Sequence, residues 1–316
     1  MLRRFPIAPD LRARVERGVP VPPAEPVTAA TVMLVREAAT AAGSRPGLGA
    51  DASGDGVEVW LLRRADGLPS APGVTAFPGG GLDERDADPD VPWRGAPVEG
   101  WGRRLGLADE DAAALLCAAV RETYEESGVL LAEVAGAQPD AAGSGVVGSG
   151  AAGSGGVGLP AGREDAERAA LARREVALSE LLRRRGLALR SDLLRPWARW
   201  TTPEPAERRH DTWFFLAAVP SAARARHVGE DGHASEAVEG RWWRPSEVLD
   251  AEARGQVRLL PPTRVALEEL AAAPDLAALL GTRRSLAAVL PRVAGAPDDL
   301  HLLADLPEHP DPVGSV

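Results

Sequence analysis

The chain has 316 residues, of which 45% are hydrophobic, so it can bury the core of one sizeable domain with additions or of two smaller domains. Its 36 basic and 46 acidic residues give a formal net charge of −10, and there is no basic tract, which argues against binding to nucleic acid. Every basic residue is arginine, which excludes a lysine nucleophile, and the single cysteine, Cys117, excludes an intrachain disulfide and a cysteine-rich zinc site.

The first part of the chain predicts an arm, two strands and a glycine-rich segment. Residues 1–26 are rich in Pro and Arg, and we expect a loosely attached arm. Apolar runs with β-branched residues at 28–38 and 57–65 predict two strands, and the turn-forming loop between them indicates an antiparallel pair. The segment VTAFPGGGLDERD follows, in which Pro78 and the glycines at 79–81 allow the backbone to approach a ligand closely.

The next segment, ADEDAAALLCAAVRETYEES, predicts a helix that begins at the acidic residues 109–111 and ends at Gly128. Glu122, Glu125 and Glu126 have i, i+3 and i+4 spacing, so their carboxylates should share one helix face. Like charges this close destabilise a bare helix, which indicates a divalent cation that prefers oxygen ligands, Mg2+ or Mn2+, between them. Taken alone, the same residues also fit a solvated acidic face.

The rest of the chain predicts a linker followed by helices and strands. Residues 135–162 are almost entirely Gly, Ser, Ala and Val without periodicity, which is typical of a low-complexity linker or insertion. The elements expected after it are a helix over 163–186, strands over 212–219 and 241–244, a helix that begins at Pro245, and two short helices between 261 and 293. We expect frayed residues from about 297 onward. Strands with only a few helices indicate an α+β fold.

Two stretches together resemble the box of the Nudix hydrolases, G-x5-E-x7-R-E-U-x-E-E-x-G-U, in which U is aliphatic. The first is FPGGGLDERD, where Gly80 takes the place of the box glycine and Asp86 that of the first glutamate. The second is AVRETYEESGVLL, where only Thr123 departs from the pattern and the matching residues are Arg121, Glu122, Glu125, Glu126, Gly128 and Val129. Asp86 and Arg121 are 35 positions apart instead of eight, so about 27 residues are inserted, and we place the insertion at about 87–108.

A split box preceded by FPGG is similar to one branch of the Nudix superfamily, that of the long peroxisomal coenzyme A diphosphatase and its bacterial relatives. The segments RPWARWTTPE, RRHDTWFFLA, RWWRPSEVL and LLPPTR look like downstream landmarks of that branch. LLRRADGLPSAPGVTAFPGG partly resembles its coenzyme A signature, although Ala71 stands where the signature has histidine. The resemblance covers roughly residues 28–270.

The resemblance implies a Nudix fold, a mixed β-sheet sandwiched between α-helices, over residues 27–260, with a helical C-terminal extension over 261–316. It implies Mg2+-dependent hydrolysis of a diphosphate linkage, with coenzyme A or acyl-CoA as the preferred substrate and (acyl-)4′-phosphopantetheine and adenosine 3′,5′-bisphosphate as products. Alternative substrates are NADH, ADP-ribose or another nucleotide. An alternative of a different class is a non-catalytic Nudix-fold module that senses a ligand.

The resemblance also implies roles for residues of the box. Glu125 and Glu126 would be the principal metal ligands together with the carbonyl group of Gly79. Glu122 would bind a further metal or orient the attacking water, and Arg121 would hold a glutamate through a bidentate contact that lysine could not make. Asp86 would anchor its loop, and Gly128 would end the helix.

Further candidates lie outside the helix. A later acidic residue would complete the catalytic group, and Glu236 is preferred over Glu239. The substrate-binding candidates are Arg63, Arg64, Phe77, Gly80 and Gly81. Asp211, His210, Arg208 and Arg209 fit either a site or an ordinary surface, and Trp213 and Trp242 fit either a nucleotide platform or the core.

The expected partner is a small nucleotide-type substrate, and a homodimer is a further expectation. No stretch approaches about 18 uncharged apolar residues, and the N-terminal segment has no continuous apolar run, so we expect no membrane insertion and a cytoplasmic location.

Overall fold

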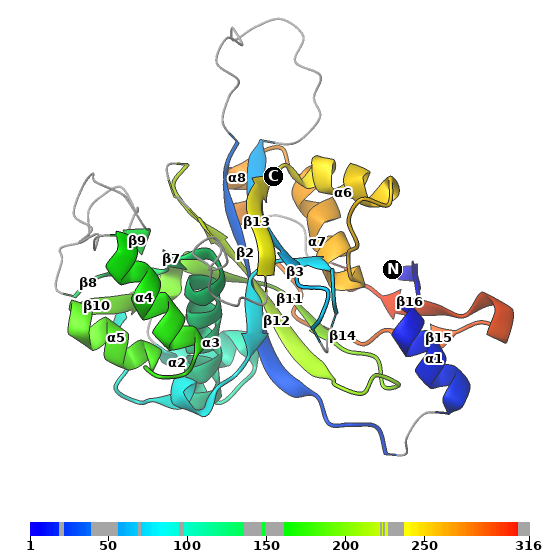
Figure 1. Cartoon of the computed structure of the whole chain (residues 1–316), viewed down its shortest axis with the longest axis horizontal. Coiled ribbons are helices and arrows are strands. Elements are labelled where there is room, and N and C mark those ends of the chain that lie inside the picture. The colour runs from blue at the N-terminus through cyan, green and yellow to red at the C-terminus, as the bar shows by residue number, and fades with distance from the viewer. Residues whose placement is uncertain are drawn as a thin grey trace, which may run out of the picture.

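The computed structural model describes residues 1–18, 22–38, 56–68, 71–94, 98–135, 147–148, 161–221, 223, 225–226 and 237–308. At its centre is an eight-stranded mixed sheet with the strand order β13 (Ala237–Trp243), β3 (Val57–Arg64), β2 (Val27–Glu37), β12 (His210–Ala218), β11 (Leu194–Thr201) and β14 (Ala288–Val289). Two short strands complete it, β4 (Thr75–Ala76) beside β3 and β5 (Gly79–Gly81) beside β2. Helices cover both faces, with α3 (Asp109–Ser127) on one and α6 (Pro245–Ala253) and α7 (Pro261–Ala272) on the other (Figure 1). The predicted α+β fold, a mixed sheet between helices, is confirmed.

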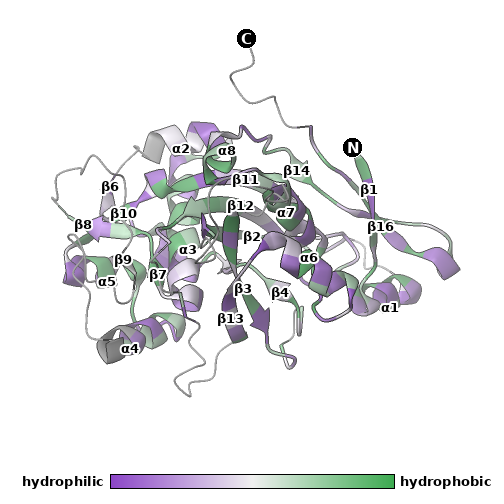
Figure 2. Ribbon diagram, turned by 90° about the horizontal axis from the view of Figure 1, so that it is seen from above, coloured by the Kyte–Doolittle hydropathy of each residue, from purple (hydrophilic) through white to green (hydrophobic). Residues whose placement is uncertain are grey.

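Side chains of the central strands alternate between the two faces of the sheet. On β2, Ala30, Val32 and Leu34 pack into the core on the α3 side, whereas Met33 and Val35 pack into the core on the α6–α7 side. The apolar run of β2 is therefore nearly continuous because both of its faces are buried. The surrounding helices carry both hydrophilic and hydrophobic colours in Figure 2, as helices with one face against a sheet should.

The sheet divides between β2 and β3. The two strands are antiparallel with Val35 opposite Val59, which confirms the predicted pairing. Farther along, β3 pairs with β4 and β2 pairs with β5, so the glycine strand enters the sheet beside β2. The strands predicted over 212–219 and 241–244 correspond to β12 and the end of β13.

Helix α3 has local signals at both ends. Asp109, Glu110 and Asp111 in its first turn complement the helix dipole. At its other end Gly128 takes the left-handed conformation with φ 73°, and its N–H donates to the carbonyl oxygen of Tyr124 at 2.9 Å. Twelve of its 19 residues are buried. The predicted helix, including its end at Gly128, is confirmed.

A second helical layer packs beside α3 and contains α4 (Ala161–Ala172) and α5 (Leu178–Arg185) (Figure 1). The prediction of one helix over 163–186 is wrong, because the chain turns at Arg174, which has a positive φ of 61°. The turn lets Leu171 and Leu182 both reach the core on the α3 side. No glycine marks this turn in the sequence, so the charged run reads as one helix.

The segment expected as an insertion, about 87–108, contains regular structure. It contains the strand β6 (Trp93–Arg94) and the helix α2 (Val98–Leu105). Strand β6 forms a small sheet with β10 (Leu187–Arg190) and β8 (Ala132–Val134), and a separate two-stranded sheet is formed by β7 (Val129–Leu130) and β9 (Val147–Gly148). Trp101 and Leu105 of α2 are buried in the core on the α3 side. The insertion is thus part of the packed domain.

The two ends of the described chain pair with each other. The elements involved are β1 (Leu2–Pro6), β16 (His301–Asp305) and β15 (Arg292–Ala294), which form a sheet in the order β1, β16, β15, and α1 (Pro9–Arg17). We expected a loosely attached arm at 1–26 and a frayed tail from about 297. For these strands and α1 the expectation is wrong, because Phe5, Leu302 and Ala304 are buried in the core on the α6–α7 side.

The extension from residue 261 is helical only in its first part. The two short helices predicted there are confirmed as α7 and α8 (Leu276–Gly281), and the extension also contains β14, β15, β16 and the 3-10 turn η4 (Pro297–Asp299). Two other 3-10 turns, η1 (Glu84–Ala87) and η2 (Ser191–Leu193), lie earlier in the chain. Within the described ranges, no helix is both long enough and apolar enough to cross a membrane.

Candidate active site

Arg121 on α3 is the centre of a buried network of charged groups. Its Nε and Nη2 donate to the two carboxylate oxygens of Asp86, each at 2.9 Å, in a bidentate pair. Its Nη1 donates to Glu122 at 2.5 Å and to Glu125 at 3.4 Å. Nη2 also donates to the carbonyl oxygen of Gly81 at 2.9 Å. One guanidinium therefore joins the glycine strand, the loop after it and two glutamates of the helix.

Asp86 connects the two halves of the split box across 35 positions of sequence. Its side chain is only 1% exposed, and besides Arg121 it accepts a hydrogen bond from the backbone N–H of Asp83 at 2.8 Å. Asp83 in turn accepts from the N–H of Arg85, which completes a capping box at the start of η1. Both oxygens of Asp86 thus have partners in the protein.

The glycine strand β5 lies very close to the carboxylates of α3. The N–H of Gly79 donates to Oε2 of Glu126 at 2.8 Å. A Cβ atom on Gly80 would lie 2.6 Å from the carboxylate of Glu122, and a Cβ on Gly79 would lie 2.5 Å from the carbonyl oxygen of Ala30. Only glycine permits this approach.

The carboxylates of Glu122 and Glu125 are largely withdrawn from water, with side chains 14% and 13% exposed. Burial, followed by the negative charge of Glu122, raises the pKa of Glu125 to about 7, and the positive charge of Arg121 opposes the shift only in part. For Arg121, burial lowers the pKa, but its hydrogen bond to Asp86 and the charges of the carboxylates outweigh burial and raise it. Glu125 can therefore exchange a proton near neutral pH while Arg121 stays charged.

The donor set suits a hard divalent cation, although the side chains are not gathered around a point. Within the described residues, no three His, Cys, Asp or Glu side chains are grouped closely enough to hold a metal ion as they stand. Arg121 holds Glu122, and the N–H of Gly79 holds Glu126. Oxygen ligands are those that Mg2+ and Mn2+ prefer, and a cation would favour the ionised form of Glu125, whose charge is otherwise costly here. The residues present therefore fit such an ion after rotation of their side chains.

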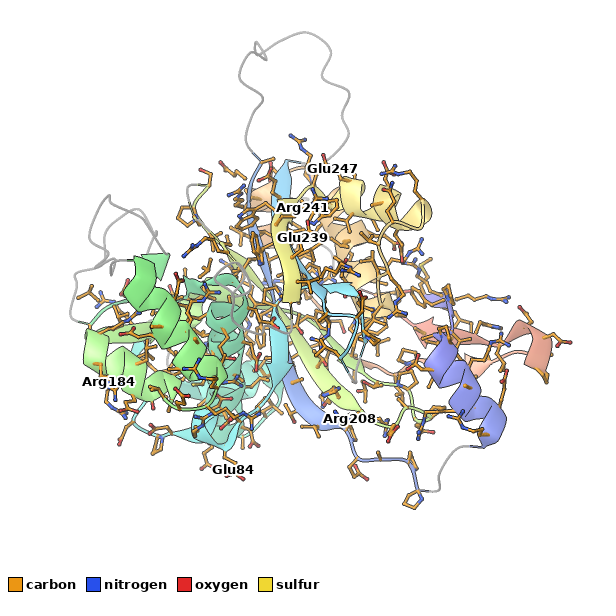
Figure 3. The ribbon with its side chains drawn as sticks, viewed as in Figure 1. Glu84, Arg184, Arg208, Glu239, Arg241 and Glu247 are labelled. Carbon is orange, nitrogen blue, oxygen red and sulfur yellow. The ribbon has the colours of Figure 1, made fainter. Side chains whose placement is uncertain are left out.

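Other candidates lie away from these carboxylates. Arg63 pairs with Asp66 at 2.9 Å and lines a cavity of about 500 Å³ between β3, β4, β13 and α6, which none of the glutamates of α3 lines. Leu61 and Trp243 in its wall belong to the core on the α6–α7 side, so the cavity opens on the opposite face of the sheet from α3. Glu239 lines the same cavity, and Figure 3 shows it on β13 near Arg241 and Glu247.

The remaining candidates pack in the core or contact other groups of the protein. Phe77 is buried in the core on the α6–α7 side. His210 has a lowered pKa because of burial first and the positive charges of Arg64 and Arg208 second. Asp211 accepts from Arg199 at 2.6 Å and from Thr201 at 3.2 Å. Trp242 packs edge-to-face on Trp60 with ring centroids 5.7 Å apart, and Trp213 is buried in the core. Arg209 donates to the carbonyl oxygen of Ala24 at 2.8 Å. Glu236 lies outside the described residues.

One residue beside the site was not predicted from the sequence. Arg168 of α4 is 2% exposed and donates to backbone carbonyl groups at the end of α3. In the sequence it is one of many arginines in a charged helix, and nothing in that pattern distinguishes it from its exposed neighbours.

The comparisons with known proteins agree with this geometry. Residues 103–270, slightly more than half of the chain, match the family model described as the NUDT19 Nudix domain. The fold is similar to that of a Nudix hydrolase from Alicyclobacillus acidocaldarius, with a TM-score of 0.58, 27% sequence identity, and coverage of 82% of this chain and 97% of that one.

Two further solved structures are more distant. An Ap4A hydrolase from C. elegans has a TM-score of 0.33 and 12% identity, over 78% of this chain and 96% of its own. The Nudix hydrolase RenU from M. smegmatis has a TM-score of 0.31 and 15% identity, over 77% of this chain and 83% of its own.

Members of this superfamily generally use divalent metal ions and act on small nucleotide-type substrates. The match over 103–270, together with the fold, shows that this chain belongs to the Nudix superfamily and is a Nudix-type hydrolase.

Proposed function

We propose that this protein is a Mg2+-dependent diphosphatase and that its metal is bound by Glu122, Glu125 and Glu126. The observation that carries the proposal is the bidentate pair between Arg121 and Asp86, which brings both halves of the split box together on the α3 side of the sheet. The pair shows that Asp86 and Arg121, although 35 positions apart in the sequence, are in direct contact in the fold. Mn2+ should be able to replace Mg2+, since it prefers similar oxygen ligands.

Each residue has a task that follows from its surroundings. Arg121 donates to Glu122 and Glu125 and so supports their orientation toward the glycine strand. Without a bound metal, Glu125 has a pKa of about 7 and can hold or release a proton near neutral pH, and a bound cation would favour its ionised form. The lack of side chains on β5 leaves its backbone accessible at the carboxylates, where the carbonyl group of Gly79 is the proposed additional ligand. The cation, when bound, supplies positive charge to the oxygens of the diphosphate.

For the substrate we propose coenzyme A or an acyl derivative, cleaved at its diphosphate to (acyl-)4′-phosphopantetheine and adenosine 3′,5′-bisphosphate. The support is the likeness of the split box and of the landmarks after it to the coenzyme A diphosphatase branch. Ala71, in place of the histidine of the signature, has a φ of 48°, so this loop has a backbone conformation that is uncommon for a non-glycine residue.

The test is a substrate panel. The purified protein is incubated with Mg2+ and, separately, with coenzyme A, acetyl-coenzyme A, NADH, ADP-ribose, nucleoside triphosphates and diadenosine polyphosphates, and the products are identified by mass spectrometry. We expect turnover of a coenzyme A compound that stops when the metal is chelated. Turnover of only another compound would refute the coenzyme A assignment, and turnover of none would refute the proposed diphosphatase.

A further inference from the structure

Helix α4 places one buried charge against the end of the helix that carries the glutamates. Arg168 is among the largest fully buried side chains, and its guanidinium reaches the last turn of α3. A buried arginine is costly unless its donors have partners, so these partners indicate what it does.

The partners are backbone carbonyl groups. Nε of Arg168 donates to the carbonyl oxygen of Tyr124 at 3.1 Å, and Nη2 donates to that of Glu125 at 3.2 Å. The carbonyl oxygen of Tyr124 also accepts from the N–H of Gly128 at 2.9 Å, so Arg168 adds a second donor there and supplies one to that of Glu125. A positive charge at the end of a helix is also favourable to the helix dipole. Arg168 therefore caps the last turn of α3, which contains Glu125 and Glu126.

The glycine that ends α3 makes room for this contact. A Cβ atom on Gly128 would lie 2.8 Å from Nη1 of Arg168. Gly128 thus has two functions, since it also takes the left-handed conformation that a helix end requires. The match between this glycine and this arginine indicates that the end of α3 and α4 pack as one unit.

Arg168 also ties a third segment to the helix. Its Nη2 donates to the carbonyl oxygen of Arg226 at 2.9 Å. Asp165, one turn earlier on α4, accepts from the guanidinium of Arg226 at 3.1 Å and lies 3.8 Å from Nη1 of Arg168. The end of α3, helix α4 and the segment after β12 therefore meet at one guanidinium.

We propose that Arg168 is a positioning residue for the metal-binding glutamates. By fixing the carbonyl groups of Tyr124 and Glu125, it holds the backbone from which Glu125 and Glu126 extend, so that both carboxylates can meet the same cation. This inference rests on the proposed metal site. It makes α4 part of the catalytic apparatus, although α4 contributes no ligand.

The matched control for Arg168 is Arg185 of α5. Arg185 also approaches Tyr124, but it donates to the phenol oxygen at 3.2 Å and pairs with Glu167, and it is 10% exposed. Arg168→Met and Arg185→Met each remove a largely buried guanidinium and keep an apolar stem. Only the first removes a cap from the backbone of α3.

The experiment compares the variants by Mg2+ and Mn2+ calorimetry without substrate, by kcat and KM, and by thermal unfolding. We expect Arg168→Met to weaken metal binding and to lower kcat by about 10- to 100-fold, with a smaller change in KM, as is usual when a residue behind a metal ligand is removed. Arg185→Met should lose thermal stability with metal affinity and kcat within about twofold of the unaltered protein. Equal metal affinity in a folded Arg168→Met variant and in Arg185→Met would overturn the proposal.

A second variant decides the matter if Arg168→Met does not fold. Arg168→Lys keeps the charge but cannot reach both carbonyl groups as a planar fork does. Faster amide exchange over residues 121–128 together with weaker metal binding would support the proposal, and unchanged values of both would overturn it. An unaltered protein that binds neither metal would refute the proposed metal site itself, and this is seen before any variant is compared.

Discussion

The two faces of the central sheet carry the same kinds of charged side chain in different surroundings. On the α3 face, the side chains of Arg121 and Asp86 are 9% and 1% exposed. On the α6 face, Arg241 and Glu239 are 54% and 61% exposed at the rim of an open cavity of about 500 Å³ (Figure 3). An arginine beside a carboxylate is present in both places, but only the first pair is taken out of water.

The difference teaches that burial, and not the presence of a charged pair, distinguishes the face that carries the proposed site from the other face. Exposed pairs are screened and contribute about 0–1 kcal/mol, whereas breaking a buried pair leaves an uncompensated charge and costs about 3–5 kcal/mol. The proposed site is accordingly assigned from the buried carboxylates and not from the cavity on the α6 face. The comparison can be tested by making the same substitution on each face.

The largest effect should come from the glutamates. Glu125→Gln removes the charge of a proposed metal ligand, and we expect the rate to fall by about a hundredfold or more with the fold retained. Glu247→Gln makes the same change in the wall of the cavity and should leave the rate within about twofold. Steady-state kinetics at saturating Mg2+ measures both, and equal rates would remove the functional distinction between the faces.

The next effect concerns stability. Arg121→Lys keeps the charge but loses the bidentate contact with Asp86, so unfolding in urea should show a loss of about 3 kcal/mol. Arg241→Lys on the other face should change the free energy of unfolding by no more than about 0.5 kcal/mol. A loss of similar size in both variants would mean that burial does not separate the two pairs.

A smaller effect separates two neighbouring glycines. A Cβ on Gly80 would meet the carboxylate of Glu122 at 2.6 Å, whereas the nearest atom to a Cβ on Gly81 is the carbonyl oxygen of Thr28 at 3.9 Å. Gly80→Ala should therefore displace Glu122 and lower kcat by about 10- to 100-fold, while Gly81→Ala should have little effect. The prediction fails if the two variants have the same kcat.

The smallest effect is a dependence of stability on pH. The pKa of Glu125 is raised by burial from 4.5 to about 7 in the folded protein, so its ionisation costs stability, and metal-free protein should lose stability as the pH rises from about 4.5 to about 7. Glu125→Gln removes that loss. The difference in free energy of unfolding between the variant and the unaltered protein should therefore be more favourable to the variant at pH 8 than at pH 5, by on the order of 1 kcal/mol. Thermal unfolding in chelator at the two pH values measures it, and an equal difference at both would contradict the raised pKa.

The parts of the fold that were predicted correctly have local causes. Helix α3 was predicted from its acidic first turn and Gly128, and β2 and β3 were predicted from apolar runs joined by a turn-forming loop. Each of these signals lies within a few residues of the element that it specifies. The Nudix box, although split, supplied the connection between Gly80 and Arg121 that no local rule could have given.

The parts that were not predicted depend on contacts between distant segments. The strands β6, β8 and β10 are two to four residues long, too short for a periodic pattern, and they exist because they pair with one another. Arg174 has a positive φ at the turn between α4 and α5, and arginine, unlike glycine, gives no indication of such a conformation in the sequence. The burial of Arg168 is decided by the packing of α4 on α3, and an isolated arginine in a charged helix carries no sign of it.

The pairing of β1 with β16 has a consequence for how the chain is made. The amino group of Met1 donates to the carbonyl oxygen of Leu306 across 305 positions, so β1 leaves the ribosome long before its partner exists. Phe5 lies opposite Leu302 of β16 and remains without this neighbour until most of the chain has been synthesised, which favours late closure of this small sheet. Because Leu2 lies opposite Asp305, a permuted chain that runs from Leu306 into Met1 through a short link would form the same two strands as a local hairpin, and this sheet should then close early.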